Sequence, residues 1–345
     1  MVKSIIVASV LGAAASAMAQ TPAATPASVT TPTPAAASVS KLDMDVLHVQ
    51  VILDHLGFSP GVLDGHRGMS FTAAIKGFQE SQGLPVTGDP DAATLKALFP
   101  YRHWRPTVEI ALTKEMLDYQ YTPEIPHGED AQAKLPALNY RTPMEKLAEG
   151  FHTTPETLVA LNSPDTKLTV GTKVVFPDAL PDRQNYDAKL KPEWRATLAM
   201  LNVDSAQPQV AKVVVSKSDK VLRGYDANGK LVAQFQVTTG STHDPLPLGT
   251  WKIYGADYNP KFHFNPALFW DAKKGEKKAM LPAGPNGPVG VVWLDLSKEH
   301  YGIHGTPEPS LIGRTESHGC VRLANWNAAR LAMMIRPGTP AIFQE

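Results

Sequence analysis

The first hydrophobic pattern in the chain has the period of a helix. Between residues 43 and 100, apolar side chains recur at spacings of three and four and form two faces, Val46, Val49, Leu53 and Leu56 on one and Phe71, Ala74, Ile75 and Phe78 on the other. This spacing predicts two amphipathic helices. A third helix is expected after Asp89, a candidate N-cap followed by Pro90, with Leu95 and Leu98 as its apolar side. The pattern therefore predicts a small three-helix domain.

The pattern becomes less regular between residues 101 and 178. Residues 101–138 are assigned to a connector of undetermined structure, in which the segment from Val108 to Tyr121 favours an amphipathic helix. Residues 139–178 have the order strand, helix, helix, strand, with Thr154 as a candidate helix cap. This order predicts a small α+β segment.

Strand character dominates residues 205–345. The segments rich in valine, isoleucine, threonine and aromatic residues are 210–215, 231–238, 251–254 and 289–296. Such composition is typical of strands, and the Asp-Ala-Asn-Gly sequence at 226–229 is expected to form a hairpin turn. The pattern predicts a mostly β domain.

One helix and one insertion interrupt this β pattern. The helix is expected from Trp326 to Ile335, with Asn325 as its cap and Pro337-Gly338 as its terminator. The insertion, residues 256–288, contains prolines and glycines and carries Trp270. A long segment of this kind is a candidate lid that lines a substrate groove. The fold class expected for the whole chain is multidomain, with a three-helix domain, an α+β segment and a mostly β domain that has one main helix.

The first 42 residues differ in composition from the rest. Lys3 precedes an apolar run, and Ala17-Met18-Ala19 has the small residues of a cleavage site, so residues 1–19 are expected to be a secretory signal peptide. The alternative, a membrane anchor, needs about 20 apolar residues, more than this run provides. Residues 20–42, rich in proline, alanine and threonine, are expected to form an extended linker.

The signal peptide predicts an exported protein, in the periplasm or the cell wall. No later segment is apolar and long enough to span a bilayer, so we expect no transmembrane segment in the mature chain. The 33 basic residues balance the 33 acidic ones, and no long basic run is present. The chain therefore lacks the electrostatic footprint of a protein that binds nucleic acid.

The single cysteine of the chain, Cys320, lies in a segment that also contains His304 and His318. A cysteine attacks as the thiolate, so the site is expected to lower the thiol pKa or to take its proton through an imidazole. His318 lies two positions before Cys320 and shares its face on an extended chain, whereas the fold has to return His304. An amide group beside Gly319 or Cys320 could donate to an oxyanion. Together these groups favour acyl transfer.

Two other interpretations fit the same residues. A cysteine with two histidines resembles an incomplete zinc site, although structural zinc takes four ligands and its thiolates usually come in close pairs, which this chain lacks. Cys320 could also be a small buried hydrophobic residue among hydrogen-bonded core histidines. Spacing alone leaves all three interpretations open.

The segment Ser317-His318-Gly319-Cys320-Val321-Arg322, preceded by His304-Gly305-Thr306, resembles the motif of L,D-transpeptidases of the YkuD family. Residues 239–251 resemble the segment before the catalytic loop of that family, and the resemblance covers residues 205–345. It implies a YkuD-like β-sandwich in which Cys320 is the nucleophile, His304 the base and His318 a further catalytic residue. The residues that it implies for oxyanion and substrate binding are Gly319, Ser317, Arg322, Gly305 and Thr306. It implies no cofactor and no metal ion.

Two further resemblances concern the preceding domains. Residues 43–100 resemble the three-helix peptidoglycan-binding domain, and the candidate wall contacts there are Gln79 and Gln82. Its histidines, which we interpret as surface or capping groups rather than as a zinc cluster, are His48, His55 and His66. Residues 139–178 resemble a LysM repeat that lacks the usual Gly-Asp near its start, so glycan binding and a spacer role both stay open.

The function implied by the resemblance is acyl transfer to build the cell wall. An exported L,D-transpeptidase forms a thioester between its cysteine and a tetrapeptide stem of peptidoglycan and releases D-alanine. It then passes the acyl group to an amine of another stem, which makes a 3-3 cross-link, or to a lipoprotein anchored to the wall. Water as acceptor would make the same site a carboxypeptidase or a cross-link hydrolase. A non-catalytic wall-binding protein is the remaining alternative, and the expected partners are peptidoglycan stem peptides and glycan.

Overall fold

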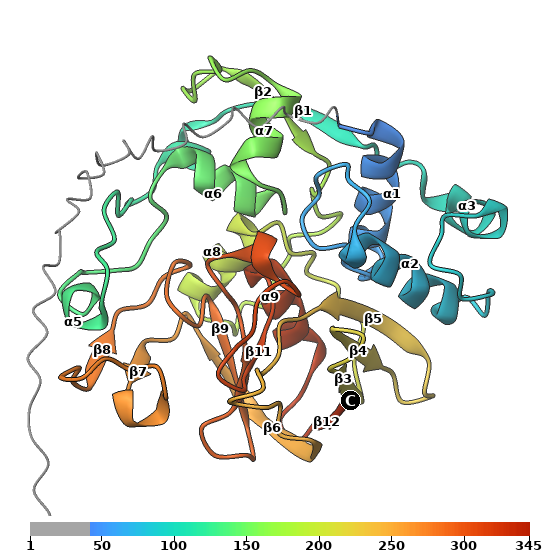
Figure 1. The fold of residues 1–345 in the computed structure, drawn as a ribbon. Helices are drawn as coiled ribbons and strands as arrows, with labels where there is room; N and C mark the ends of the chain where they lie inside the picture. The colour runs from blue at the N-terminus through green and yellow to red at the C-terminus, as the bar shows by residue number, and fades with distance from the viewer. Residues whose placement is uncertain (1–41) are drawn as a thin grey trace, which may run out of the picture. The chain divides into compact units, whose positions relative to one another are not determined.

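The computed structural model describes residues 42–345. The expected signal peptide, residues 1–19, and all but the last residue of the expected linker, residues 20–42, lie outside the described residues. Along the described chain, helices come first, a small two-stranded sheet follows and a large sheet comes last (Figure 1). None of the helices within residues 42–345 combines the length and the apolar content that a bilayer crossing requires.

The three helices expected in residues 43–100 are present. They are α1 (Met44–His55), α2 (Met69–Ser81) and α3 (Ala92–Leu98), and a 3-10 turn, η1 (Phe99–Tyr101), follows. Their apolar faces meet in one core. Asp91, not Asp89, caps α3, because the Asp91 carboxylate accepts the Thr94 amide hydrogen at 2.8 Å. Pro90 therefore lies before the helix and not in its first turn.

Residues 107–177 contain an α+β unit whose first strand comes earlier than expected. β1 (Thr107–Ala111) pairs antiparallel with β2 (Lys173–Pro177), and α6 (Pro143–Gly150) and α7 (Pro155–Leu161) come between them in the chain. The two expected helices and the last strand are present as α6, α7 and β2, but the first strand, β1, lies in residues 101–138, and two further short helices follow it before α6. The resemblance of this unit to a LysM repeat stays a prediction.

The amphipathic helix expected from Val108 to Tyr121 is not formed. β1 is followed there by one short helix, α4 (Lys114–Leu117), and α5 (Glu129–Gln132) comes later in the same segment. Val108 and Ile110 both pack on the core of this unit, which is the period of two that a strand requires.

The C-terminal part contains one sheet of eight strands in the order β11-β10-β9-β6-β12-β3-β4-β5. These strands are β3 (Lys212–Ser216), β4 (Val221–Tyr225), β5 (Leu231–Gln236), β6 (Gly249–Tyr258), β9 (Val292–Leu296), β10 (Gly302–His304), β11 (Val321–Arg322) and β12 (Pro340–Gln344). The register of β6 shifts between Ile253 and Gly255, so its first half pairs with β12 and its second half with β9. Such an irregularity bends a strand, and the sheet curls as one continuous layer.

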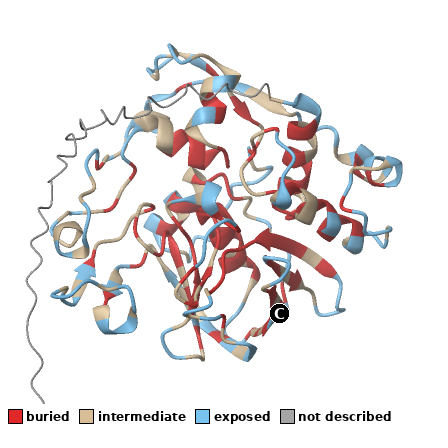
Figure 2. Ribbon diagram, in the orientation of Figure 1, coloured by how far each residue is buried: buried red, intermediate tan, exposed pale blue. Residues whose placement is uncertain are grey.

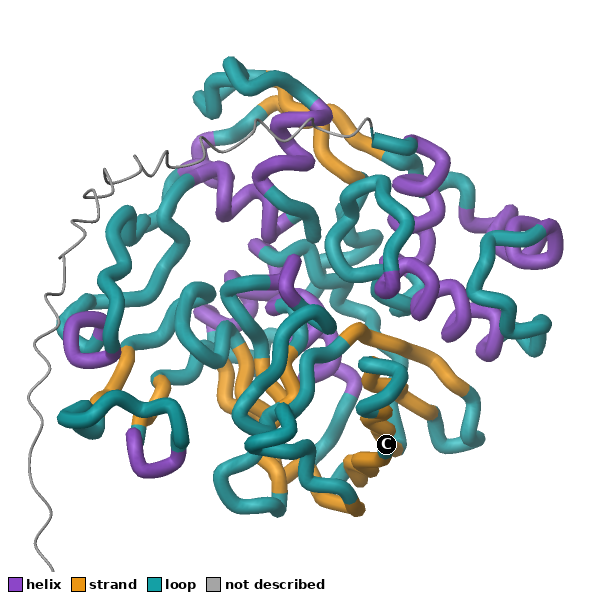
Figure 3. Tube along the Cα trace, in the orientation of Figure 1, coloured by secondary structure: helices purple, strands orange, loops and turns teal. Residues whose placement is uncertain are grey.

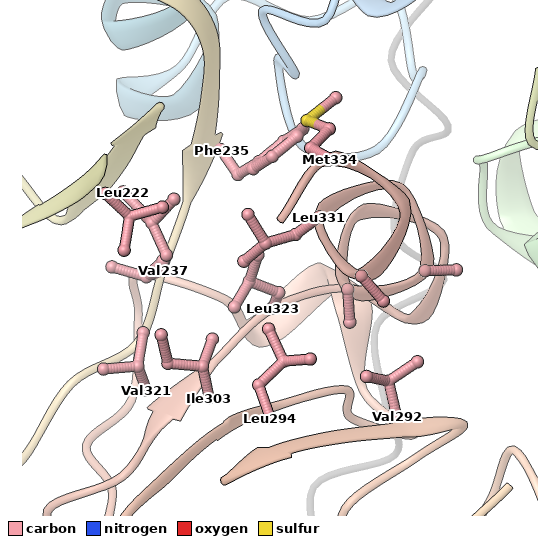
Figure 4. Packing of buried hydrophobic residues seen from close by; sticks show 14 of the residues in the cluster. Leu222, Phe235, Val237, Val292, Leu294, Ile303, Val321, Leu323, Leu331 and Met334 are labelled. Atoms are coloured by element: carbon pink, nitrogen blue, oxygen red, sulfur yellow. The ribbon is translucent and has the colours of Figure 1, made fainter. Parts of the chain in front are cut away.

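Helix α9 (Asn325–Met334) packs on the inner face of this curled sheet. Leu331 and Met334 of the helix point toward Leu323 and Phe235, while Ile303 and Val321 lie side by side on their strands (Figure 4). Burying a side chain of this size contributes about 1.5–3 kcal/mol. A further helix, α8 (Pro192–Met200), adds Trp194 and Leu198 to the same core. Asn325, the expected cap of α9, is instead its first residue, and its side chain forms no cap.

The insertion after β6 packs on residues 125–138. Its short strands β7 (Phe262–Phe264) and β8 (Ala279–Leu281) form a hairpin with a 3-10 turn, η2 (Pro266–Leu268), and the remainder is mostly loop (Figure 3). Phe264 and Leu281 share a small core with Leu138. The Leu138 amide donates to the carbonyl oxygen of Ala283, and the Asn286 amide donates to that of Leu138, both at 2.9 Å.

The three-helix domain covers the edge of the large sheet. β5 is the last strand in the order, yet it is largely buried, as its red colour in Figure 2 shows. The Ser59 amide donates to the carbonyl oxygen of Gln234, and the Gln234 amide donates to that of Gly57, each at 2.9 Å. These bonds occupy main-chain groups that an exposed edge strand would offer to other chains.

A buried charged cluster joins three parts of the chain. Arg330 of α9 donates two hydrogen bonds of 2.9 Å to the carboxylate of Asp54 in α1. His152, which follows α6, lies with Nδ1 2.7 Å from the same carboxylate and with Nε2 2.8 Å from the carbonyl oxygen of Leu201. Burial alone would raise the pKa of Asp54, but the charges of Arg330 and His152 hold it below its ordinary value.

Candidate active site

Cys320 lies directly before β11, beside β10. The two strands pair in parallel, with Ile303 opposite Val321 and His304 opposite Arg322. Ile303 and Val321 point into the core (Figure 4), so alternation along the strands places Cys320, His304 and Arg322 on the other face. The fold thus places His304 on the strand that neighbours Cys320 and on the same face of the sheet.

The hydrogen bond of His304 determines which ring nitrogen can act as a base. Nδ1 lies 2.7 Å from the carbonyl oxygen of Gly305, which can only accept, so Nδ1 carries the proton. Burial lowers the pKa of His304 to about 3, and the charge of Arg322 acts in the same direction. The ring is therefore neutral near pH 7, and its Nε2 carries the lone pair of a base.

The thiol of Cys320 lies in an environment that favours its protonated form. Burial raises the pKa of Cys320, while the Gly302 amide and the charge of Arg322 oppose this effect only in part. The sequence predicted either a lowered thiol pKa or an imidazole that takes the proton. The raised pKa is contrary to the first of these, since burial dominates and neutral His304 supplies no positive charge to stabilise a thiolate. A neutral thiol near a neutral imidazole fits general-base catalysis, in which the proton leaves as the sulfur attacks.

Gly302 and Trp293 belong to this site and were not found in the sequence. The Trp293 ring stacks on His304 with 5.4 Å between the ring centroids and an angle of 20°. A Cβ atom added at Gly302 would lie 2.4 Å from the same ring, so only glycine fits here. A glycine inside a strand often indicates that other atoms approach the main chain closely, so the glycine at position 302 could have indicated this contact.

The loop that presents Cys320 is fastened to residues 239–241. The Ser317 amide donates to the carbonyl oxygen of Thr239 at 3.0 Å, and the Ser241 amide donates to that of Ser317 at 3.2 Å. The Ser317 hydroxyl donates to the carbonyl oxygen of Cys320 at 2.5 Å. Gly319 has a φ of +94°, and a Cβ atom there would lie 2.4 Å from the Tyr301 ring. Ser317 and Gly319 therefore shape the turn that ends at Cys320.

The side chain of His318 is held by the insertion. Its Nε2 lies 2.9 Å from Oδ1 of Asp271, and its ring meets the ring of Phe269 at 5.0 Å in an edge contact. The next residue, Trp270, is 58% exposed and stacks on His243 with 4.4 Å between the centroids. His318 thus joins the loop of Cys320 to the candidate lid, and its expected catalytic role stays a prediction.

The remaining expected site residues lie around His304 and Cys320. Thr306 is buried, and its hydroxyl accepts the Glu308 amide hydrogen at 3.3 Å. Arg322 donates from Nη1 to the carbonyl oxygen of Glu316 at 3.3 Å. Gly305 lies against the side chain of Asn325, where a Cβ atom would come within 2.1 Å of Oδ1. Asn325 is therefore a neighbour of the site that the sequence did not reveal.

The polar residues singled out in the three-helix domain make contacts within the chain. Nε2 of His48 lies 2.9 Å from the carbonyl oxygen of Trp104, and Nε2 of His55 lies 2.7 Å from that of Asp178. Gln79, a candidate wall contact, is buried and donates to Thr87, Thr94 and the main chain of Asp89, so it stabilises its own domain. Among residues 42–345 no three His, Cys, Asp or Glu residues are grouped so that they could hold a metal ion.

Two parts of the chain match known protein families. Residues 211–343 match the L,D-transpeptidase catalytic domain, and residues 43–98 match a putative peptidoglycan binding domain. These matches confirm the resemblances drawn from the motif at Cys320 and from the three-helix pattern.

Individual relatives match shorter parts of this chain. Putative L,D-transpeptidase YkuD of Bacillus licheniformis is 32% identical over 128 residues, which are 37% of this chain and 62% of that protein. The protein of the same name in Bacillus subtilis is 51% identical over 55 residues, 16% of this chain and 34% of that protein. Among solved structures, an L,D-transpeptidase from Mycobacterium smegmatis is 19% identical and covers 39% of this chain and 58% of its own, with a TM-score of 0.32. By these matches, the chain carries an L,D-transpeptidase catalytic domain at residues 211–343 and, before it, a putative peptidoglycan-binding domain at residues 43–98.

Proposed function

We propose that the chain is an exported, cysteine-dependent L,D-transpeptidase that acts on the tetrapeptide stems of peptidoglycan. The observation that carries this proposal is the placement of His304. Its Nδ1 proton is engaged by the Gly305 carbonyl oxygen at 2.7 Å, which leaves Nε2 as a base on the sheet face that Cys320 shares. The family match of residues 211–343 supports the same reaction class.

In the proposed first half-reaction, Cys320 attacks the carbonyl carbon of the third stem residue. The thiol proton moves to Nε2 of His304 as the carbon–sulfur bond forms. Main-chain amides at Gly319 and Cys320 donate to the oxyanion, and Arg322 adds positive charge nearby. The carbon–nitrogen bond to D-alanine then breaks, and His304 returns its proton to the leaving amine. The products are free D-alanine and a thioester on Cys320.

The second half-reaction transfers the acyl group from the thioester. An acceptor amine attacks the thioester carbon and gives a proton to His304, the carbon–sulfur bond breaks, and the proton returns to sulfur. The acceptor is an amine of another stem, which gives a 3-3 cross-link, or a lipoprotein lysine. Neither step requires a metal ion or a nucleotide. The insertion with Trp270 and Asp271 lies beside His318, and we assign it to the wall of the substrate groove.

The decisive experiment incubates the mature chain with purified disaccharide-tetrapeptides and identifies products by mass spectrometry. A cross-linked dimer that lacks one D-alanine supports transfer. A tripeptide without dimer assigns the site to hydrolysis, the same chemistry with water as acceptor. Cys320→Ser and His304→Gln are expected to abolish both products, with exposed His103→Gln as the matched control that leaves them unchanged. Turnover by Cys320→Ala at the wild-type rate would refute the role of Cys320 as the nucleophile. A wild-type chain that forms neither product would be a non-catalytic wall-binding protein.

A further inference from the structure

Asn325 is a buried residue whose side-chain amide forms hydrogen bonds with residues outside its own helix. It is the first residue of α9 and has no solvent exposure. Its Oδ1 accepts the Val291 amide hydrogen at 3.1 Å. Its Nδ2 donates to the carbonyl oxygen of Pro285 at 3.1 Å and to Oε1 of Glu149 at 2.9 Å. All hydrogens of the amide therefore have acceptors, and the orientation of the group is fixed.

This amide lies directly against the main chain that follows His304. A Cβ atom added at Gly305 would lie 2.1 Å from Oδ1 of Asn325, and one added at Gly290 would lie 1.9 Å from the same oxygen. The Asn325 amide therefore fits here only because residues 290 and 305 have no side chain. Since the Gly305 carbonyl oxygen accepts the Nδ1 proton of His304, a shift of Gly305 would change the orientation and the tautomer of the ring.

The residue that holds the Asn325 amide, Glu149, belongs to another part of the molecule. Glu149 lies in α6 of the α+β unit, 176 residues before Asn325 in the sequence, and is buried. Its carboxyl group is also faced by the Tyr140 hydroxyl and lies near Glu145. Tyr119 lies close enough for the charge of Glu149 to raise the pKa of its hydroxyl group. Among the described residues that face Glu149 here there is no cation, and burying a carboxyl group without an ion pair costs free energy unless hydrogen bonds such as that from Asn325 satisfy it.

We infer that Glu149 and Asn325 are positioning residues for His304, so that the α+β unit contributes to the catalytic machinery through the chain Glu149, Asn325, Gly305, His304. This inference rests on the proposed function for its catalytic consequence, but not for its structural content. Neither residue touches the reacting atoms. They hold the carbonyl group that keeps the proton on Nδ1 and the lone pair on Nε2.

The test compares Glu149→Ala and Asn325→Ala with Glu149→Gln, which keeps an oxygen acceptor for the Asn325 amide at nearly the same volume. We expect the alanine variants to lower kcat for tetrapeptide transfer by about tenfold to a hundredfold, the effect of a small displacement of a catalytic group. KM of Glu149→Ala should stay within about twofold, because Glu149 acts on the insertion only through Asn325. Asn325→Ala also removes the hydrogen bond to Pro285 of the insertion, so its KM is expected to rise in addition. Glu149→Gln should retain most of the activity. Glu156→Ala, an exposed glutamate on the neighbouring helix α7, is the matched control and should behave as wild type.

A spectroscopic measurement separates positioning from a general loss of structure. With isotope-labelled histidine, the ring signals of His304 are assigned by their loss in His304→Gln, and they report which nitrogen carries the proton. Wild type should show a protonated Nδ1, and the alanine variants should show a mixture of tautomers. If an alanine variant fails to fold, the nearly isosteric Asn325→Asp, which removes the Nδ2 donor without a cavity, is expected to show the same mixture.

The outcomes distinguish this inference from the proposed reaction. Wild-type protein without activity on stems refutes the proposed function, whereas the tautomer of His304 still tests the positioning role. Alanine variants that keep wild-type kcat and a protonated Nδ1 overturn the inference. A fall in kcat with an unchanged tautomer also overturns it, since Glu149 and Asn325 would then act through something other than His304.

Discussion

Glu149→Gln should change the stability of the protein in a way that depends on pH. Burial raises the pKa of the Glu149 carboxyl group from 4.5 to about 7, and the nearby Tyr140 hydroxyl and the hydrogen bond from Asn325 offset only part of this effect. The folded state therefore binds this proton more tightly than the unfolded state does. The stability that comes from the protonated form is fully present below pH 4.5 and is lost as the pH rises through 7.

The size of the effect follows from the difference between the two pKa values. From 4.5 to about 7 is about 2.5, and each unit corresponds to about 1.36 kcal/mol, so the loss approaches about 3 kcal/mol above pH 7. Glutamine keeps the volume and the acceptor oxygen but does not titrate. The free energy of unfolding of Glu149→Gln, relative to wild type, should therefore rise by up to about 3 kcal/mol between pH 4.5 and pH 8.

The assay is urea unfolding of both proteins at several pH values, followed by the fluorescence of the buried Trp194 and Trp326. Comparison with wild type at each pH removes the titration of other groups common to both proteins. The exposed Glu156→Gln serves as control and should show a difference that does not vary with pH. A constant difference between Glu149→Gln and wild type from pH 4.5 to pH 8 would refute the reasoning, because Glu149 would then have the same pKa in both states.

Three further predictions concern the thiol, the buried ion pair and the insertion. The rate of Cys320 alkylation should still increase above pH 9.0, the ordinary thiol pKa, because burial raises the pKa of Cys320; a rate that levels off by pH 7 contradicts this. Arg330→Met should reduce the free energy of unfolding by about 3–5 kcal/mol, because it leaves the Asp54 charge buried beside His152 alone, and thermal unfolding at the wild-type temperature would be inconsistent with that role. Trp270→Ala should raise KM for disaccharide-tetrapeptides by about tenfold with little change in kcat, and an unchanged KM would remove Trp270 from the groove.

The sequence predicted those features whose determinants are local. The apolar faces of α1 and α2 repeat every three or four residues, so they identify helices without knowledge of any partner. The histidine, glycine and cysteine at 318–320 are likewise adjacent in the chain. By contrast, β1 is five residues long and finds its partner β2 more than sixty residues later, so a strand there had no local signal strong enough to exclude a helix. β10 and β11 are shorter still, and their pairing with each other and of β10 with β9 depends on contacts between distant parts of the chain.

The pKa values of Cys320 and His304 depend on contacts that could not be predicted from the sequence. A cysteine among histidines suggested either a lowered thiol pKa, which a charged imidazole would cause, or a neutral imidazole that takes the thiol proton. The structure buries His304 under Trp293 and near Arg322, and both effects keep the ring neutral. Asn325 was misassigned for a related reason. An asparagine before an apolar helix is typical of an N-cap, and only the proximity of Glu149 and Gly305 reveals its other use.

Within residues 42–345, hydrogen bonds and an ion pair join the three-helix domain to the C-terminal domain, which would affect how a wall-bound enzyme selects its substrate. Domains joined by a flexible linker meet a bound polymer at many distances, with an effective concentration that the linker sets. Here main-chain hydrogen bonds tie Gly57 and Ser59 to β5, and the Asp54–Arg330 pair ties α1 to α9, so little freedom is left between the three-helix domain and Cys320. A glycan held by the three-helix domain would therefore meet Cys320 at one fixed separation. Such a separation selects stems by their position along the strand, which a tethered domain cannot do.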